Sequence, residues 1–443
     1  MIDGFRETFA HVVATLTRIL GPRHIALAEE VAQDSLVKAL QTWPHEGVPA
    51  NPSAWLIQVA KNRALDVLRR EKWLADRSDV VAALAVAQAP ASAAGGRGFS
   101  GDGVAFRGEP AAVGDDDLSM IFLACHPILS REARVALTLK TVCGFGVGEI
   151  ARALLSREDA IAQRLVRAKR QLRDADVRFE LDPSEYSSRL ESALDVIYLL
   201  FNEGYAAHAG DDLIRTELCD EAIRLASLVA DHPALATPAV HALLALMLLQ
   251  AARLPARVGD GAELQRLIDQ DRSRWDQALI QRGMYHLDRA AAGDTLTTYH
   301  LEAGIAACHA AAARYEDTLW SRIVDLYDSL VVIKPTPIVA LNRAIALSRL
   351  RGARAGIAAI EAIAGDPALA RYYLLPAAMG ELMRESGDTV RAAEYFEAAL
   401  ECECSEPERR FIERRLRETL ALARGSSGAG RSSGSGGLDR SGG

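Results

Sequence analysis

The spacing of apolar residues predicts helices along nearly the whole chain. Apolar positions recur at intervals of three and four residues, and runs that alternate apolar with polar residues are almost absent. Two segments interrupt this pattern: a Gly-rich stretch within residues 77–117 and a Gly/Ser-rich tail over residues 425–443. We therefore expect an all-α protein with a flexible linker and a disordered tail.

These interruptions divide the rest of the chain into three helical segments, at residues 1–76, 118–182 and 183–424. The last segment contains one clear repeat. A helix that ends near Gly352 is followed by a second helix, and the same layout returns around Gly387, 35 residues later. Helix pairs joined at a glycine turn with a period of about 34 residues are typical of tetratricopeptide repeats.

The helix predicted from Pro52 to Arg70 has two distinct faces. Its apolar stripe, expected in the core, contains Leu56, Ala60, Ala64, Val67 and Leu68. The neighbouring stripe offers an aromatic ring, an amide, a carboxylate and guanidinium groups. Unpaired bases are recognised by stacking on aromatic rings and by hydrogen bonds to base edges, so this face suits an opened DNA strand. The alternative is a solvated basic face with Trp55 in the core.

The preceding helix, over residues 27–41, has an acidic face. Glu29, Glu30 and Asp34 are expected to point outward, while Val31, Leu36 and Leu40 are expected inward. Acidic side chains beside a basic helix favour a protein partner over uniform contact with DNA. An ordinary solvated face is the alternative.

The segment at residues 118–182 shows a more specific pattern. Helices are expected at residues 131–142, 147–154 and 158–173, with a short turn between the last two. Residues 161–173 contain five Lys or Arg and no Asp or Glu. A short helix, a tight turn and a longer basic helix are typical of the helix-turn-helix, whose second helix enters the major groove. Its buried stripe is expected to be Ile161, Leu165, Ala168 and Leu172.

The two small units, in this order, resemble the extracytoplasmic-function group of the sigma-70 family of sigma factors. That group keeps sigma region 2 and the helix-turn-helix of sigma region 4. The matching stretches cover residues 28–36, 54–70, 149–151 and 163–170. The resemblance implies a sigma factor that binds core RNA polymerase, through the coiled coil of its clamp, and promoter DNA.

The resemblance also implies a role for particular side chains. Residues expected to contact the polymerase are Glu29, Glu30 and Asp34. Residues in the helix associated with the −10 element are Trp55, Asn62, Arg63, Asp66, Arg69 and Arg70. Residues in or beside the helix that reads the −35 element are Arg157, Glu158, Gln163, Arg164, Arg167 and Arg170.

The long C-terminal segment is similar to a subgroup of these factors that carries a tetratricopeptide-like extension. Residues 199–205 and 337–344 carry that similarity, which implies that the extension takes part in regulation in place of a separate anti-sigma partner. The extension could also bind a protein partner of its own. The alternative is a helix-turn-helix regulator whose repeats sense a ligand or partner. A polar cluster of Asn202, Glu203, His208, Asp211 and Asp212 could form a ligand pocket or a purely structural network.

Other chemistry finds little support in the sequence. The sequence contains no phosphate-binding loop, no dinucleotide-binding glycine pattern and no HExxH motif. We therefore expect that the protein is not an enzyme and binds no cofactor. Cys125-His126 and Cys402-Glu403-Cys404 lack the four convergent ligands of a structural zinc site, and we expect no metal. Six scattered cysteines, no secretory signal and no apolar run that could span a membrane indicate the cytoplasm.

Overall fold

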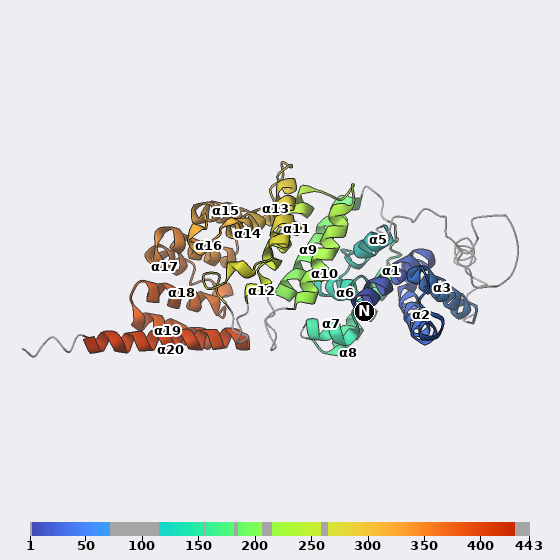
Figure 1. Cartoon of the computed structure of the whole chain (residues 1–443), viewed down its shortest axis with the longest axis horizontal. Coiled ribbons are helices and arrows are strands. Elements are labelled where there is room, and N and C mark those ends of the chain that lie inside the picture. The colour runs from blue at the N-terminus through green and yellow to red at the C-terminus, as the bar shows by residue number, and fades with distance from the viewer. Residues whose placement is uncertain are drawn as a thin grey trace, which may run out of the picture. The chain divides into compact units, whose positions relative to one another are not determined.

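The computed structural model describes residues 2–70, 115–154, 156–180, 185–205, 215–257 and 265–429. Within these residues it contains 19 α-helices and no strand, which confirms the all-α prediction. Two compact units are present (Figure 1). The first comprises Met1–Glu203 and Asp220–Ala236, and the second comprises Gly204–Cys219 and Thr237–Gly443.

The first three helices pack against one another around a shared core. They are α1 (Ile2–Leu20), α2 (Ile25–Glu46) and α3 (Pro52–Arg70), drawn in blue in Figure 1. A short 3-10 helix, η1 (Pro22–His24), joins α1 to α2. The largest fully buried side chains of this core are Leu16, Ile25 and Leu56.

Six further helices belong wholly or largely to the first unit. They are α5 (Asp115–Ala124), α6 (Arg131–Thr141), α7 (Val147–Ala153), α8 (Glu158–Asp174), α9 (Tyr186–Tyr205) and α10 (Thr216–Asp231). The three helices predicted within residues 118–182 are confirmed to within one residue at each end. Two polar contacts fix their starts: Ser130 accepts the Ala133 N–H, and Glu149 accepts the Gly146 N–H at 2.7 Å.

The second unit is a succession of helices, most of which pack against the next helix in the chain (Figure 1). They are α11 (Pro238–Ala251), α12 (Leu254–Arg257), α13 (Gln277–Ala290), α14 (Thr298–Ala311), α15 (Trp320–Ile333), α16 (Pro337–Arg351), α17 (Ala353–Glu361), α18 (Leu374–Glu385), α19 (Thr389–Leu400) and α20 (Glu406–Ala429). Helix α11 is apolar and buried on all sides because both α13 and α14 pack on it.

The helix–glycine–helix layout predicted twice in the C-terminal segment is present. Gly352, between α16 and α17, and Gly387, between α18 and α19, have φ values of 88° and 91°. This backbone conformation is costly for residues with a Cβ, which explains glycine at both turns. The tetratricopeptide assignment itself remains a prediction.

Two predicted segments lie largely outside the described residues. Nearly all of the expected linker, residues 77–117, lies there. The expected disordered tail begins at residue 425, yet α20 continues to Ala429, so residues 425–429 are helical and the rest of the tail is outside the described part. The bounds of the five predicted segments remain predictions.

Candidate nucleic-acid and polymerase interface

Helix α3 separates its apolar and polar residues as predicted. Leu56, Ala60, Ala64 and Leu68 are buried, and Val67 is half-buried. On the other face Asn62, Arg63 and Asp66 are exposed. Helix α3 includes Arg69 and Arg70, but their side chains lie outside the described part of the structure.

Trp55 is intermediate between the two alternatives given for it. Its side chain is half-buried, and its ring packs against Trp43 of α2 with the centroids 5.5 Å apart and the planes tilted by 60°. One part of the indole therefore supports the α2–α3 contact, while another part remains accessible beside the exposed face of α3.

The inward face of α2 differs from the prediction. Leu40 was expected inward but is 63% exposed, and Leu36 is half-buried. Val31 is fully buried as predicted, and the small residues Ala28, Ala32, Ser35 and Ala39 complete the buried stripe. The prediction was wrong for Leu40, because Ser35 and Ala39 form the buried face at this end of the helix. Val37 is also 53% exposed, so two large apolar side chains face outward on this helix.

The three acidic residues of α2 have different environments. Glu30 and Asp34 are exposed as predicted, and Asp34 accepts a hydrogen bond from Arg63 Nε of α3 at 2.9 Å. Glu29 was expected to point outward, but it is only 7% exposed. Its Oε2 accepts a hydrogen bond from Lys169 Nζ of α8 at 2.7 Å. Sequence periodicity within α2 gave no sign that a distant helix covers this carboxylate.

Helix α8 also has the predicted two faces. Ile161, Leu165, Ala168 and Leu172 are buried, and Arg164 is half-buried. The remaining predicted contact residues are exposed: Arg157, Glu158, Gln163, Arg167 and Arg170. Two of these have neighbours on the same helix, since Arg167 contacts Gln163 at 3.4 Å and Arg170 contacts Asp174 at 3.3 Å. Such exposed intrahelical contacts are weak and leave the side chains available.

Polar contacts join the first three helices to α5–α8 within the first unit. The acidic start of α5 faces α1: Asp116 accepts from Arg18 at 2.7 Å and from Thr15 at 3.0 Å. Asp117 lies 3.4 Å from His11, and Arg6 of α1 pairs with Glu149 of α7 at 2.7 Å. The sequence showed only the acidic run at residues 115–117. Its partners lie about 100 residues away and could not be identified from local patterns.

Burial and charge set the protonation behaviour of this junction. The hydrogen bond to Asp117 raises the pKa of His11, against the opposing effect of burial. Burial lowers the pKa of Lys140, while the nearby Glu29 carboxylate opposes that shift. Glu29 therefore faces two lysines, Lys140 and Lys169, and its Oε1 atom is buried without a hydrogen-bond partner. The Glu29 carboxylate is therefore stabilised by the charges of the two lysines while it is partly removed from water.

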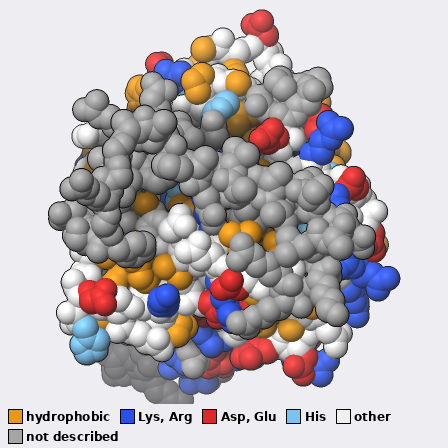
Figure 2. Space-filling model, turned by 90° about the vertical axis from the view of Figure 1, so that its right-hand side faces the viewer, with side chains coloured by type: hydrophobic (Ala, Val, Ile, Leu, Met, Phe, Trp, Pro, Cys, Tyr) orange, Lys and Arg blue, Asp and Glu red, His pale blue; other side chains and the backbone are white. Residues whose placement is uncertain are grey.

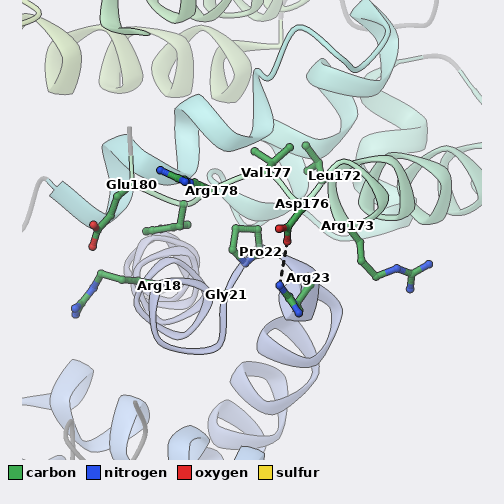
Figure 3. A pocket seen from close by; sticks show the side chains of 11 residues that line it. Arg18, Gly21, Pro22, Arg23, Leu172, Arg173, Asp176, Val177, Arg178 and Glu180 are labelled. Atoms are coloured by element: carbon green, nitrogen blue, oxygen red, sulfur yellow. Dashed lines mark hydrogen bonds and ion pairs between the residues drawn. The ribbon is translucent and has the colours of Figure 1, made fainter. Parts of the chain in front are cut away.

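A pocket of about 560 Å³ lies where η1 meets the end of α8 (Figure 3). Arg23 and Asp176 point toward each other across it and form an ion pair of 3.0 Å. The lining contains further charges of both signs: Arg18, Arg173, Arg178 and Glu180. Figure 2, which views the molecule from the right-hand side of Figure 1, shows basic side chains interspersed with acidic ones on the visible surface.

Comparison with known proteins places the N-terminal helices in a family. The model of sigma-70 region 2 matches residues 5–74, a range that covers nearly all of α1, α2 and α3. A family of unknown function, DUF6596, matches residues 189–291, from α9 to the end of α13. An uncharacterized protein of Rhizobium meliloti (strain 1021) is 35% identical over 405 residues, which cover 89% of this chain and 90% of that protein.

The chain belongs to the family of that Rhizobium protein and carries a sigma-70 region 2 domain at its N-terminus. This finding confirms the first part of the resemblance seen in the sequence. The region 2 domain includes the exposed face of α3 and the acidic face of α2.

Among the helices that the structure describes, none is both long and apolar enough to cross a membrane. Of the polar cluster considered in the sequence, Asn202 is exposed and Glu203 half-buried, whereas His208, Asp211 and Asp212 lie outside the described residues.

Proposed function

We propose that this protein is a sigma factor, which binds core RNA polymerase and directs it to specific promoters without catalysing a reaction itself. The observation that carries the proposal is the sigma-70 region 2 domain at residues 5–74, with Asn62, Arg63 and Asp66 displayed on its helix α3. These side chains supply the amide, guanidinium and carboxylate groups that bind base edges and phosphates of an opened strand.

We infer that α2 is the surface that docks on the polymerase. Val37 and Leu40 are exposed apolar side chains on this helix, and Glu30 and Asp34 are exposed acidic ones. An apolar centre bordered by charges is the usual composition of a protein interface. The coiled coil of the polymerase clamp is the proposed partner.

Helices α7 and α8 support the proposed contact with the −35 element. A short helix, a turn and a longer helix form the arrangement expected for a helix-turn-helix. Gln163, Arg167 and Arg170 are exposed opposite the buried stripe of α8. Gln and Arg are the residues that make bidentate contacts with adenine and guanine in the major groove.

In the first unit, α8 contacts α2 and covers part of the proposed polymerase surface. Glu29 is a proposed polymerase contact, yet Lys169 of the proposed −35 helix covers it. Docking through Glu29 therefore requires α8 to leave α2. We infer that polymerase binding opens this contact and that the C-terminal helices, with their tetratricopeptide-like pairs α16–α19, regulate the opening.

A transcriptional regulator that binds only duplex DNA is the second candidate. The exposed face of α8 would serve such a protein equally well. The region 2 domain favours the sigma factor, because a duplex-binding regulator has no use for a second surface suited to unpaired bases.

Run-off transcription with purified bacterial core polymerase and a library of upstream fragments tests the proposal. We expect transcripts from a subset of fragments, only when both core enzyme and this protein are present. Binding to duplex DNA without any protein-dependent transcript would favour the regulator and contradict the sigma assignment.

A further inference from the structure

Three arginines of the second unit gather around two aromatic rings. Arg253 immediately precedes α12, Arg257 ends it, and Arg272 begins the 3-10 helix η4 (Arg272–Arg274). The guanidinium carbons of Arg253 and Arg272 lie 5.5 and 4.7 Å from the centroid of the Trp275 ring. Arg257 lies 4.0 Å from the centroid of Tyr205. We call Arg253, Arg257, Arg272 and Trp275 the arginine cluster.

The hydrogen-bond partners of these arginines are all uncharged. Arg253 donates to the side-chain oxygens of two glutamines, Gln250 at 3.2 Å and Gln270 at 3.5 Å. Arg257 donates to the Tyr205 carbonyl at 2.6 Å.

Arg272 donates to the carbonyls of His309 and Ala312, both at 2.6 Å, and contacts the Thr318 hydroxyl at 3.4 Å. Glu316 and Asp317 contribute favourable charge near Arg272, but Asp317 is paired with Arg314 at 3.0 Å. Within the described part of the chain, none of the three arginines forms an ion pair with a carboxylate.

Such an arrangement is energetically unusual. A partly buried lysine can lose its proton, but the guanidinium of arginine stays charged throughout the physiological range. Burial lowers the pKa of Arg253, Tyr205 opposes that shift, and the neighbouring Arg257 adds to it. Charges removed from water are normally paired, so three clustered guanidinium groups without a carboxylate favour an anion from outside the chain.

Unpartnered hydrogen-bond groups provide an independent indication of a ligand. Arg272 Nε and Trp275 Nε1 are buried without a hydrogen-bond partner, and Trp275 is only 3% exposed. His309 Nδ1 is also buried without one, and His309 is 9% exposed. Burial, followed by the charges of Arg253 and Arg272, lowers the pKa of His309 to about 3. The imidazole is therefore neutral and adds no charge of its own.

We propose that the arginine cluster binds the phosphate group of a small molecule. Two N–H donors without acceptors, at Arg272 and Trp275, match an acceptor-only oxyanion. Three guanidinium groups favour a phosphate, with a charge of about −1.5 to −2 near neutral pH, over a singly charged carboxylate. The residues of the site belong to the second unit, none of them is a proposed DNA or polymerase contact, and the inference does not depend on the sigma assignment.

Equilibrium dialysis of the full-length protein against inorganic phosphate, at constant ionic strength, tests the proposal. We expect saturable binding of one phosphate per chain, and a dissociation constant at least about tenfold higher for Arg253→Met, because a charged hydrogen-bonding group is lost. The matched control is Arg274→Met, an exposed arginine in the same 3-10 helix, which should bind as the unmodified protein does.

Melting temperature separates this role from a structural one. Arg253→Met should melt at the same or a higher temperature without phosphate, since it removes an uncompensated charge, and should lose the increase that phosphate gives. The proposal would be overturned if phosphate does not bind, or if Arg253→Met binds phosphate as tightly as the unmodified protein. It would also be overturned if acetate competes as well as phosphate does. If circular dichroism shows Arg253→Met unfolded, Arg257→Met replaces it under the same criteria.

Discussion

One ion pair links α8 to α2 within the first unit. Lys169 and Glu29 form an ion pair with side chains only 17% and 9% exposed. A buried pair contributes little compared with an apolar replacement of both partners, but loss of one partner leaves an isolated buried charge. The pair therefore acts as a specific contact that holds α8 on α2, sensitive to any change in either residue.

We expect Glu29→Gln to lower the free energy of opening between α2 and α8 by about 3 kcal/mol, because it leaves Lys169 without its carboxylate partner. Lys169→Met should lower it by less, because Glu29 still faces Lys140. Hydrogen exchange of α2 and α8 peptides measures this quantity. The double variant should lower the free energy of opening by less than the sum of the two single effects. Strictly additive losses would show that the two side chains do not interact.

The contact between His11 and Asp117 predicts a pH dependence. Its hydrogen bond raises the pKa of His11, so the folded protein holds this proton more tightly than the unfolded chain does. The stabilisation is fully present below the unfolded pKa of about 6.5 and is lost as the pH rises through the higher folded-state value. Asp116 and Asp117 of α5 are the charges that act on His11.

We therefore expect His11→Gln to destabilise the protein at about pH 5.5 and to have a much smaller effect at about pH 8.5. Urea denaturation at a series of pH values checks this. A destabilisation that is constant with pH would mean that protonation of His11 does not stabilise the α1–α5 contact.

At the scale of helices, local sequence predicted most of what the structure shows. The apolar stripes of α3 and α8 and the bounds of α6–α8 depend on helical periodicity and turn residues, which are local. The burial of Glu29 and the exposure of Leu40 were not predicted, because both depend on which distant surface covers α2. The arginine cluster was missed for the same reason, as its members are scattered from residue 253 to residue 275 with no local motif.

The close packing of α18 on α19 can be tested at Gly380. A Cβ there would lie 2.9 Å from ring atoms of Phe396, which is fully buried. Gly380→Ala should destabilise the second unit by about 1–2 kcal/mol, with overpacking exceeding the gain in helix propensity. Calorimetry should show one transition at a lower temperature. Gly365→Ala, with open space around its Cβ, is the control, and equal effects of both would contradict the packing argument.

The exposed face of α8 predicts a DNA-binding defect. Arg167→Ala should weaken promoter binding by the polymerase complex by about 1–3 kcal/mol if Arg167 contacts a base. Electrophoretic mobility shift with promoter fragments measures the change, and Arg282→Ala, an exposed arginine of α13, controls for the loss of charge. Unchanged affinity would remove Arg167 from the proposed −35 contact.

At the scale of the whole chain, helices of the first compact unit extend beyond the predicted sigma domains. Ser192 of α9 donates to the Cys125 carbonyl at 2.6 Å, and Arg224 of α10 donates to the Val142 carbonyl at 3.2 Å. These contacts show that a chain cut at residue 182 would lose part of the packing of α5 and α6. A truncation intended to isolate the first unit should therefore end at Ala236.

We expect residues 1–236 to remain folded and to initiate transcription at a different level from the full-length protein, because the proposed regulatory helices are removed. Run-off assays at matched protein concentrations measure the difference, with circular dichroism as the control for folding. Identical activity of the two proteins would contradict regulation by the C-terminal helices.

As a sigma factor, this protein should help the polymerase to open promoter DNA, beyond binding the duplex. Permanganate reactivity of unpaired thymines measures this directly on a promoter fragment that supports run-off transcription. We predict reactive thymines near the −10 element only when core polymerase and this protein are both present, and fewer with Asn62→Ala on the exposed face of α3. Promoter binding that leaves every thymine unreactive would contradict the sigma-factor account.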